Sequence, residues 1–324
     1  MKICIYGGGS IGGYIAAHLA RDNKAEVSVI ARGGTLAAIR ARGIRVKKPD
    51  EDFTVGVNAT DDPAELGVQD YVFLTLKVHQ LDAILEPLRS LVGSETAILP
   101  PNAGLPYYFT HKLPSRHADR PLPRIDPGGR QAAVMPPSQV IGCPYWIGVH
   151  SPAPGVVHRD GARALLPLGE LDGTASRRVT TLRDLLESSG IQSSVSDNIH
   201  GEVWVKFVNA LCWNPSAILT GAPNGQLGGS DVGGVIRTMM EEADAMGCEL
   251  GVRIPMSPGE RVANTSKGTY HKMSMLQDFE KGRPTELEAL FDSLRSLTDL
   301  TGLSAPTLEA VYALARLRSA VAQA

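Results

Sequence analysis

The sequence predicts two domains: an α/β domain built on a doubly wound parallel sheet, followed by an all-helical domain. Three observations support this fold class. The chain opens with a short apolar strand, a glycine-rich turn and a helix. Apolar runs of strand length then alternate with helical segments, which is typical of parallel sheets with helical crossovers. Later segments have helical periodicity alone. We therefore expect domains at residues 1–197 and 198–324.

The opening glycines are spaced as a dinucleotide-binding turn requires. The residues after the first strand read Gly7-x-Gly9-x-x-Gly12, and a helix is expected from about Ile11 to Arg21. The first glycine permits a sharp turn, the second lets the backbone approach a pyrophosphate, and the third lets the helix pack closely on the sheet. The helix N-terminus then faces the phosphates; a purely structural turn is the alternative. We expect a Rossmann-like domain whose cofactor ligands are Gly7, Gly8, Gly9, Ser10, Ile11 and Gly12.

The residue after the second strand favours NADP over NAD. The β-branched run Val27–Ala31 is followed directly by Arg32. NAD-binding domains place a carboxylate near this position for the ribose hydroxyl, whereas a guanidinium can hold a 2′-phosphate. We therefore expect NADP(H), with Arg32 as a ligand. Arg40 and Arg42 are expected to be surface charges, which is also the alternative for Arg32.

The remaining elements follow from apolar periodicity. Further strands are expected at Tyr71–Thr75, Thr96–Leu99, Val140–Cys143, Gly155–His158 and around Val195. Helices of the first domain are expected at Leu36–Arg42, Leu81–Leu91 and Arg177–Ser188. Helices of the second domain are expected at His200–Leu219, Val232–Leu250, Glu286–Thr301 and Thr307–Ala322.

Two segments have no assigned chemistry. Residues 112–130 are rich in proline, arginine and glycine without periodicity, which predicts a long surface loop, a candidate lid or oligomer contact. The last helix carries small apolar residues over Val311–Ala322. Part of that surface is a candidate contact for a second subunit in a homodimer.

Composition argues against several functions. The formal net charge is −2, which gives no electrostatic case for binding nucleic acid or membranes. No apolar run reaches the roughly 18 residues of a bilayer span, and the chain enters a strand at once, so no signal peptide is expected. The cysteines are widely spaced without a C-x-x-C pair, which argues against a metal or redox site and fits a cytoplasmic protein; they are Cys4, Cys143, Cys212 and Cys248.

Candidate catalytic residues cluster on the first helix of the second domain. Lys206, Asn209 and Asn214 lie near one helical face. Their neighbours are mostly apolar, so these polar groups need partners. Desolvation lowers the pKa of a lysine, which suits a proton donor near neutral pH. The alternative for Lys206 is a side chain that snorkels to water.

Three more polar residues stand at element ends. Asn102 follows the strand ending at Leu99, at the edge where open α/β sheets bind ligands; a turn-forming role is the alternative. Ser274 could donate a hydrogen bond to a carboxylate. Glu286 begins a predicted helix with Thr285 as a candidate N-cap, and routine helix stabilisation is its alternative role.

Together these segments resemble the ketopantoate reductase family, the NADPH-dependent 2-dehydropantoate 2-reductases. The resemblance covers nearly the whole chain. It rests on the glycine turn, Ala31-Arg-Gly33, Leu76-Lys77 and Asn102. Its most specific parts are Trp204-Val-Lys206 with Asn214-Pro215, and Ser274-Met-Leu-Gln-Asp278 with Gly282-Arg-Pro-Thr-Glu286. It implies reduction of ketopantoate to pantoate, a step of pantothenate biosynthesis.

The resemblance also implies a role for each matched residue. Lys206 would be the general acid, and Glu286 would orient the substrate or share its proton network. Ser274 would bind the substrate carboxylate and Asn214 a substrate hydroxyl. Asn102 and Lys77 would line the nicotinamide and carbonyl region, in a cleft between the domains.

The chain departs from the family at one catalytic position. Family members place an Asn four residues after the catalytic Lys, where this chain has Ala210, and Asn209 comes one residue early. One residue turns a helical side chain by about 100°. Asn102-Ala-Gly104 also differs from the usual Asn-Gly pair.

These departures leave other hypotheses open. The first is a reductase for another 2-oxo acid or ketone, for example one that makes a D-2-hydroxy acid. The second is an NADP-binding sensor without turnover. The intact set of Lys206, Asn214, Ser274 and Glu286 argues against a sensor, which needs no proton donor.

Overall fold

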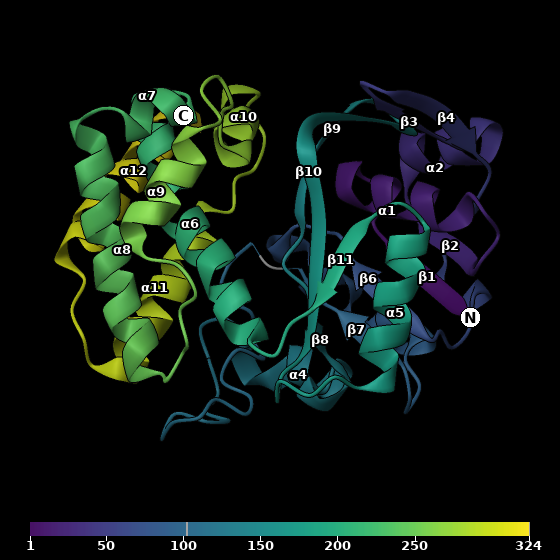
Figure 1. Ribbon diagram of the computed structural model, residues 1–324, viewed down its shortest axis with the longest axis horizontal. Helices are drawn as coiled ribbons and strands as arrows, with labels where there is room; N and C mark the ends of the chain where they lie inside the picture. Colours follow the sequence, from purple (N-terminus) through teal and green to yellow (C-terminus); the bar gives the residue numbers. More distant parts are fainter. Residues whose placement is uncertain (102, 324) are drawn as a thin grey trace. The chain divides into compact units, whose positions relative to one another are not determined.

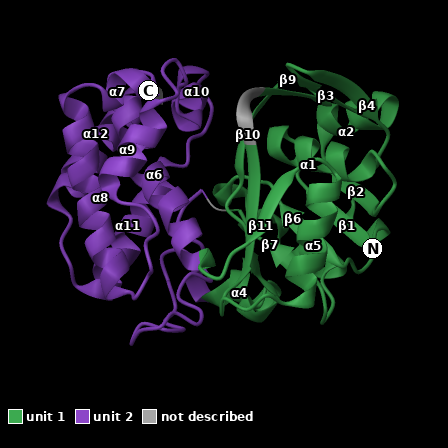
Figure 2. Cartoon of the chain, viewed as in Figure 1, with its two compact units in different colours: residues 1–102, 129–199 green, residues 103–128, 200–324 purple. Residues whose placement is uncertain are grey.

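The chain folds into two compact units and passes between them three times. The computed structural model describes residues 1–101 and 103–323. The first unit comprises Met1–Asn102 and Gly129–Ile199, and the second comprises Ala103–Gly128 and His200–Ala324 (Figure 2). The division expected from sequence differs from this one chiefly by segment 103–128, which groups with the helical unit.

A five-stranded parallel sheet forms the centre of the first unit, in the order β5-β2-β1-β6-β7. In the central register, Ile5 lies between Val29 and Phe73. The three middle strands are buried along almost their whole length, which is why they appear as continuous apolar runs in the sequence. The strands are β1 (Lys2–Tyr6), β2 (Glu26–Ile30), β5 (Asn58–Thr60), β6 (Tyr71–Leu74) and β7 (Ala97–Leu99). The predicted parallel sheet is confirmed.

A second, mixed sheet surrounds the long strand β10 (Val156–Glu170), and the sequence did not predict it. β10 pairs in parallel with β3 and β11 and antiparallel with β8 and β9. Polar residues, glycine and proline interrupt β10, so only its first residues were recognisable as a strand. Its neighbours are β3 (Ile44–Lys48), β4 (Glu51–Val55), β8 (Ile141–Gly142), β9 (Trp146–Ala153) and β11 (Gln192–Val195).

Helix α1 (Ser10–Ala20) lies between the two sheets (Figure 1). It contacts β1 and β2 on one side and β3, β9 and β10 on the other. All of its residues from Gly12 to Ala20 are buried, as expected for a helix that is apolar on every face. Close packing also depends on Gly13, where a Cβ atom would lie 3.0 Å from Cγ2 of Val157.

The other helical segments of the first unit connect the strands. α2 (Gly33–Arg42) and α5 (Arg177–Ser188) form as expected. The predicted helix Leu81–Leu91 is instead a series of short turns around Pro87, which has no N–H to donate and disfavours a regular helix. The series consists of η2 (Val78–Gln80), η3 (Asp82–Ile84), α3 (Leu85–Leu88) and η4 (Arg89–Leu91). The remaining short segments are η1 (Pro63–Glu65), η5 (Pro127–Gly129), α4 (Arg130–Val134) and η6 (Pro137–Gln139).

The regular structure described in the second unit is helical, as predicted. Helix α8 contacts α7, α9, α11 and α12, and its Glu242 carboxylate accepts the backbone N–H groups of Thr307 and Leu308 at 2.9 and 3.0 Å. This carboxylate satisfies donors that the start of α12 leaves unpaired. The helices are α6 (Ile199–Thr220), α7 (Asn224–Gly228), α8 (Asp231–Glu249), α9 (Pro258–Ser266), α10 (Ser274–Glu280), α11 (Leu287–Thr301) and α12 (Pro306–Gln323). Among the described residues, no helix has both the length and the apolar character that crossing a bilayer requires.

A proline inside α6 is compensated by a tyrosine from α12. Pro215 cannot donate the N–H that would normally bond the carbonyl of Leu211. That carbonyl instead accepts the hydroxyl of Tyr312 at 3.0 Å, and Tyr312 is fully buried. The interior of the helical unit therefore keeps this backbone oxygen satisfied. Farther along α12, Leu314, Leu317 and Val321 are exposed, and a homodimer contact there stays a prediction.

Segment 103–128 is irregular, but it is not simply a surface loop. Tyr108, Phe109 and Leu122 are buried, and the Phe109 ring lies 5.6 Å from the ring of Trp204. Its charged residues also bind the helices. Arg116 pairs with Glu249 of α8 at 2.6 Å, and Arg124 pairs with Asp299 of α11 at 2.7 Å. Most residues of the stretch 112–130 are exposed, as expected for a surface loop, but its few buried side chains and its ion pairs anchor residues 112–128 to the helical unit.

A buried histidine joins α1 to the end of α5. His18 is 2% exposed, and its Nδ1 donates to the carbonyl of Ser189 at 2.9 Å. Burial lowers the pKa of His18 to about 4, although the bond to Ser189 acts in the opposite direction. Burial likewise lowers the pKa of His200 to about 4. Both side chains are therefore neutral in the folded protein near pH 7.

Stability is expected to fall as the pH drops from about 6.5 toward 4. In that window the unfolded chain binds protons at His18 and His200 that the folded chain excludes. The contribution of the two histidines to the free energy of unfolding is therefore fully present above pH 6.5. Below that pH it decreases by up to about 1.4 kcal/mol per pH unit for each histidine. His18→Asn keeps a donor for Ser189 but cannot titrate. Urea unfolding at several pH values should show a shallower pH dependence for this variant, and an unchanged slope would contradict the assignment.

Candidate nucleotide and substrate site

The glycine turn at the end of β1 is shaped by close backbone contacts. Gly7 has a φ of +119°, a conformation that L side chains rarely adopt. A Cβ on Gly12 would collide with the carbonyl oxygen of Gly7 and with Oγ1 of Thr75. The Thr75 hydroxyl also donates to that carbonyl at 2.8 Å. Two of the three motif glycines are therefore required by the fold itself.

Gly9 is different, because no neighbour among the described residues requires it to be glycine. It is exposed, has extended backbone angles, and precedes the first residue of α1 without any side-chain cap. A Cβ added there would have no neighbour within 4 Å. The space lies at a helix N-terminus whose first N–H groups lack intrahelical partners. This open cradle fits the pyrophosphate of a dinucleotide.

Other predicted cofactor ligands lie at the carboxyl ends of neighbouring strands. Arg32 is exposed and immediately precedes α2, after the end of β2. Burial raises the pKa of Tyr6 at the end of β1, and the charge of Arg32 partly offsets this effect. Lys77 follows β6 and is half-buried, and its backbone N–H donates to Oε1 of Gln80 at 3.1 Å. β2 and β6 flank β1, so these residues surround the position where such sheets bind ligands.

The remaining residues considered in this unit are Arg40, Arg42 and Asn102. Arg40 and Arg42 are both exposed, and Nε of Arg40 donates to the carbonyl of Ala59 at 2.9 Å. Asn102, expected near the nicotinamide, lies outside the described residues.

In the second unit, α6 presents a single accessible row. Between residues 201 and 218, every position is buried except Glu202, Lys206, Asn209 and Ala210. Lys206 is half-buried in this row, and Ala210 follows one helical turn later. A proton donor placed here is partly shielded from water yet open to a ligand.

Two asparagine side chains near this row have unused acceptor atoms. Asn214 is 4% exposed, and its Nδ2 donates to the carbonyl of Ala210 at 2.9 Å. The Oδ1 atoms of Asn214 and Asn209 are buried and have no hydrogen-bond partner among the described residues. Buried polar atoms are normally paired, so these oxygens are candidates to accept a ligand hydroxyl.

The opposite face of α6 is anchored by a buried charge pair. The Trp204 indole N–H donates to Asp244 of α8 at 2.9 Å, and Asp244 also pairs with the fully buried guanidinium of Arg261 from α9. Burial raises the pKa of Asp244, and the charge of Arg261 acts against that shift. Gly247 leaves space for the indole, because a Cβ there would lie 2.7 Å from the ring.

Sequence analysis predicted Ser274 but missed Asn224, which bonds the loop that precedes Ser274. Ser274 is exposed at the first position of α10. Asn224, 4% exposed at the start of α7, donates its backbone N–H to the carbonyl of His271 at 2.9 Å. Its Oδ1 is buried without a partner among the described residues. No sequence pattern marked Asn224, because helix α7 has only five residues and is too short to show a periodicity.

Glu286 is half-buried and immediately precedes α11. The helix starts at Leu287, one residue later than predicted, so Glu286 rather than Thr285 occupies the capping position. In the segment that joins α10 to α11, the backbone N–H of Arg283 donates to the carbonyl of Asp278 at 2.9 Å. Asp278 thus links the end of α10 to the segment before α11.

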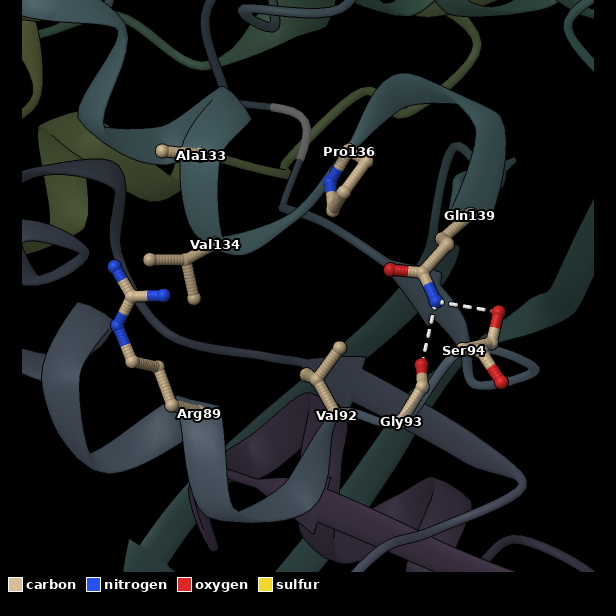
Figure 3. Close-up of a pocket in the computed structure, with 8 residues that line it drawn as sticks. All are labelled: Arg89, Val92, Gly93, Ser94, Ala133, Val134, Pro136 and Gln139. Atoms are coloured by element: carbon tan, nitrogen blue, oxygen red, sulfur yellow. Dashed lines mark hydrogen bonds between the residues drawn. The ribbon is translucent and has the colours of Figure 1, made fainter.

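A shallow hollow of about 290 Å³ in the first unit contains none of these residues. Figure 3 shows one of its lining residues, Gln139, whose Nε2 donates to the carbonyls of Gly93 and Ser94 at 2.6 and 2.9 Å. It is lined by Arg89, Val92, Gly93, Ser94, Ala133, Val134, Pro136 and Gln139. Within the described ranges, no cluster of three or more His, Cys, Asp or Glu residues could hold a metal ion.

Known protein families match both the N-terminal and the C-terminal part of this chain. Residues 3–173 match the family described as Ketopantoate reductase PanE/ApbA, and residues 198–319 match Ketopantoate reductase PanE/ApbA C terminal. The 2-dehydropantoate 2-reductase of Mesorhizobium japonicum is 39% identical over 318 residues, covering 98% of this chain and 97% of that protein.

Solved structures have the same fold. A candidate ketopantoate reductase from Ralstonia solanacearum MolK2 is 32% identical with a TM-score of 0.90, covering 99% of this chain and 98% of that one. D-mandelate dehydrogenase, solved with NADH and anilino(oxo)acetate, covers all of both chains at 18% identity and a TM-score of 0.82, which shows a shared fold. The family resemblance seen in the sequence is therefore confirmed: this chain belongs to the ketopantoate reductase family of oxidoreductases.

Proposed function

We propose that the protein reduces a 2-oxo acid to a 2-hydroxy acid with NADPH, and that its substrate is 2-dehydropantoate. The observation that carries the proposal is the position of Lys206. It lies in the one accessible row of an otherwise buried helix segment, near asparagine oxygens without described partners. Such a row combines a proton donor with acceptors for a hydroxylated, anionic substrate.

The first unit supplies the cofactor site in this proposal. Gly7, Gly8, Gly9, Ser10, Ile11 and Gly12 form the phosphate cradle. Arg32 binds the 2′-phosphate, as its exposed position after β2 permits. Lys77 and Asn102 line the nicotinamide region. NADPH, when bound, supplies the hydride.

The second unit supplies the proton and the substrate ligands. Lys206 donates a proton to the carbonyl oxygen while the carbonyl carbon accepts hydride, so the C=O π bond is replaced by one C–H and one O–H bond. Ser274 binds the carboxylate, and Asn209 and Asn214 accept hydrogen bonds from substrate hydroxyl groups. Glu286 orients the substrate within this proton network.

A second candidate is a reductase for a different 2-oxo acid on the same scaffold. The half-buried Ala210 favours it, because this position one turn after Lys206 lacks the amide of the family pattern. The mechanism would be unchanged, and only the substrate contacts would differ.

The test is oxidation of NADPH with ketopantoate, compared with pyruvate, 2-oxoisovalerate and phenylglyoxylate, and repeated with NADH. We expect ketopantoate to be the best substrate and NADPH the better cofactor, since Arg32 favours the 2′-phosphate. Preference for another oxo acid would support the second candidate. Tight NADPH binding without any turnover would instead indicate a sensor.

Gly9→Ala is expected to weaken NADPH binding at least about tenfold without lowering Tm. A methyl group fits in the apo protein, where nothing lies within 4 Å, but it would occupy space needed by the pyrophosphate. Fluorescence titration and thermal unfolding measure the two effects. Gly234→Ala on α8 is the matched control, because its Cβ is equally unobstructed. Unchanged NADPH affinity in Gly9→Ala would rule out this cradle.

Lys206→Ala is expected to lower kcat by about 10²–10⁴, the usual contribution of a positioned general acid. The KM for NADPH should stay the same, because the cofactor is assigned to the other unit. Lys267→Ala, at an exposed position on the same unit, serves as the control. A folded Lys206→Ala protein with full kcat would refute the assignment.

A further inference from the structure

The accessible row of α6 contains a carboxylate to which no role has been assigned. Glu202 lies four residues before Lys206, and both are half-buried. The residues between them, Val203, Trp204 and Val205, are buried. Glu202 and Lys206 therefore lie on one face of the helix, one turn apart.

The rotation of α6 about its axis is fixed by contacts on the opposite face. Trp204 is 0% exposed, donates to Asp244 and fills the space left by Gly247. Its ring also packs 5.6 Å from the rings of Phe109 and Phe207. Turning the helix would break these contacts, so Glu202 and Lys206 are held in the accessible row.

This geometry suits an ion pair between the two side chains. Glutamate placed four residues before lysine is the favourable order on a helix, and partial burial reduces the screening that weakens exposed pairs. One turn after Lys206, Ala210 offers no polar side chain. On the Trp204 side of the helix, Asp244 of α8 is already paired with Arg261 of α9.

We propose that Glu202 is a positioning residue for Lys206, holding the ammonium group on the accessible face and keeping it protonated before reduction. This inference rests on the proposed role of Lys206 as general acid. A neighbouring carboxylate favours the charged form of a lysine. After the proton passes to the substrate oxygen, Lys206 regains a proton from solvent, and Glu202 undergoes no net change.

The experiment is the pH dependence of kcat for Glu202→Gln and Glu202→Asp with the best 2-oxo acid. In Glu202→Gln, we expect the fall in kcat at high pH to begin about one pH unit lower, with the KM for NADPH unchanged. Glu202→Asp should give an intermediate profile, because it keeps the charge on a shorter side chain. Glu288→Gln is the matched control, since it removes an exposed carboxylate that pairs with Arg316 at 2.8 Å.

The outcomes separate this inference from the proposed function. If both Glu202 variants keep the wild-type pH profile, the inference is overturned, even if Tm falls. If the wild-type protein reduces no 2-oxo acid, or Lys206→Ala keeps full kcat, the proposed function fails instead. A shift of equal size in Glu288→Gln would also overturn the inference, because it would show a general charge effect.

Discussion

The absence of a side chain at Gly12 is the constraint on which the first unit depends. It allows the start of α1 to press against the carbonyl of Gly7 and the hydroxyl of Thr75, at the turn between β1 and its helix. Because α1 packs closely on the parallel sheet, its other side can be covered by the second sheet. There Val157 of β10 packs against Gly13. Gly9 stands at the start of the same helix, whose first N–H groups have no intrahelical partners. The core of the unit and its proposed nucleotide cradle thus have one geometric cause.

The helical unit buries several polar groups that are paired across its helices. The carbonyl exposed by Pro215 is satisfied by Tyr312, and the buried charge of Arg261 is matched by Asp244. Breaking such pairs costs more than the pairs themselves contribute, because a buried group is left without a partner. Among the described residues, the buried oxygens of Asn209, Asn214 and Asn224 have no such partner, and a few buried donors of this unit, such as Nε1 of Trp213, also lack one. Unpaired buried oxygens of this kind are what a site built to accept a polar ligand would contain.

Sequence patterns predicted the parts of the structure whose causes are local. A spacing or periodicity within one continuous segment marks each of these parts: the Gly7–Gly12 turn, the buried strands of the parallel sheet and the long helices. The β10 sheet was missed in part because the pairing of β10 with β3 joins residues more than a hundred positions apart. Asn224 was missed because its importance depends on the His271 carbonyl and on burial. Glu202 was overlooked because only the burial pattern of α6 separates it from an ordinary surface glutamate.

The grouping of segment 103–128 with the later helices bears on how such proteins can be recombined. The family modules end and begin near residues 173 and 198, which invites a chimaera joined between them. In that hybrid, Arg116 and Arg124 of one parent would meet α8 and α11 of the other, and Phe109 of one would cover Trp204 of the other. The junction would thus cut through a hydrophobic core rather than between two cores. Exchange of the helical unit would need residues 103–128 to travel with it.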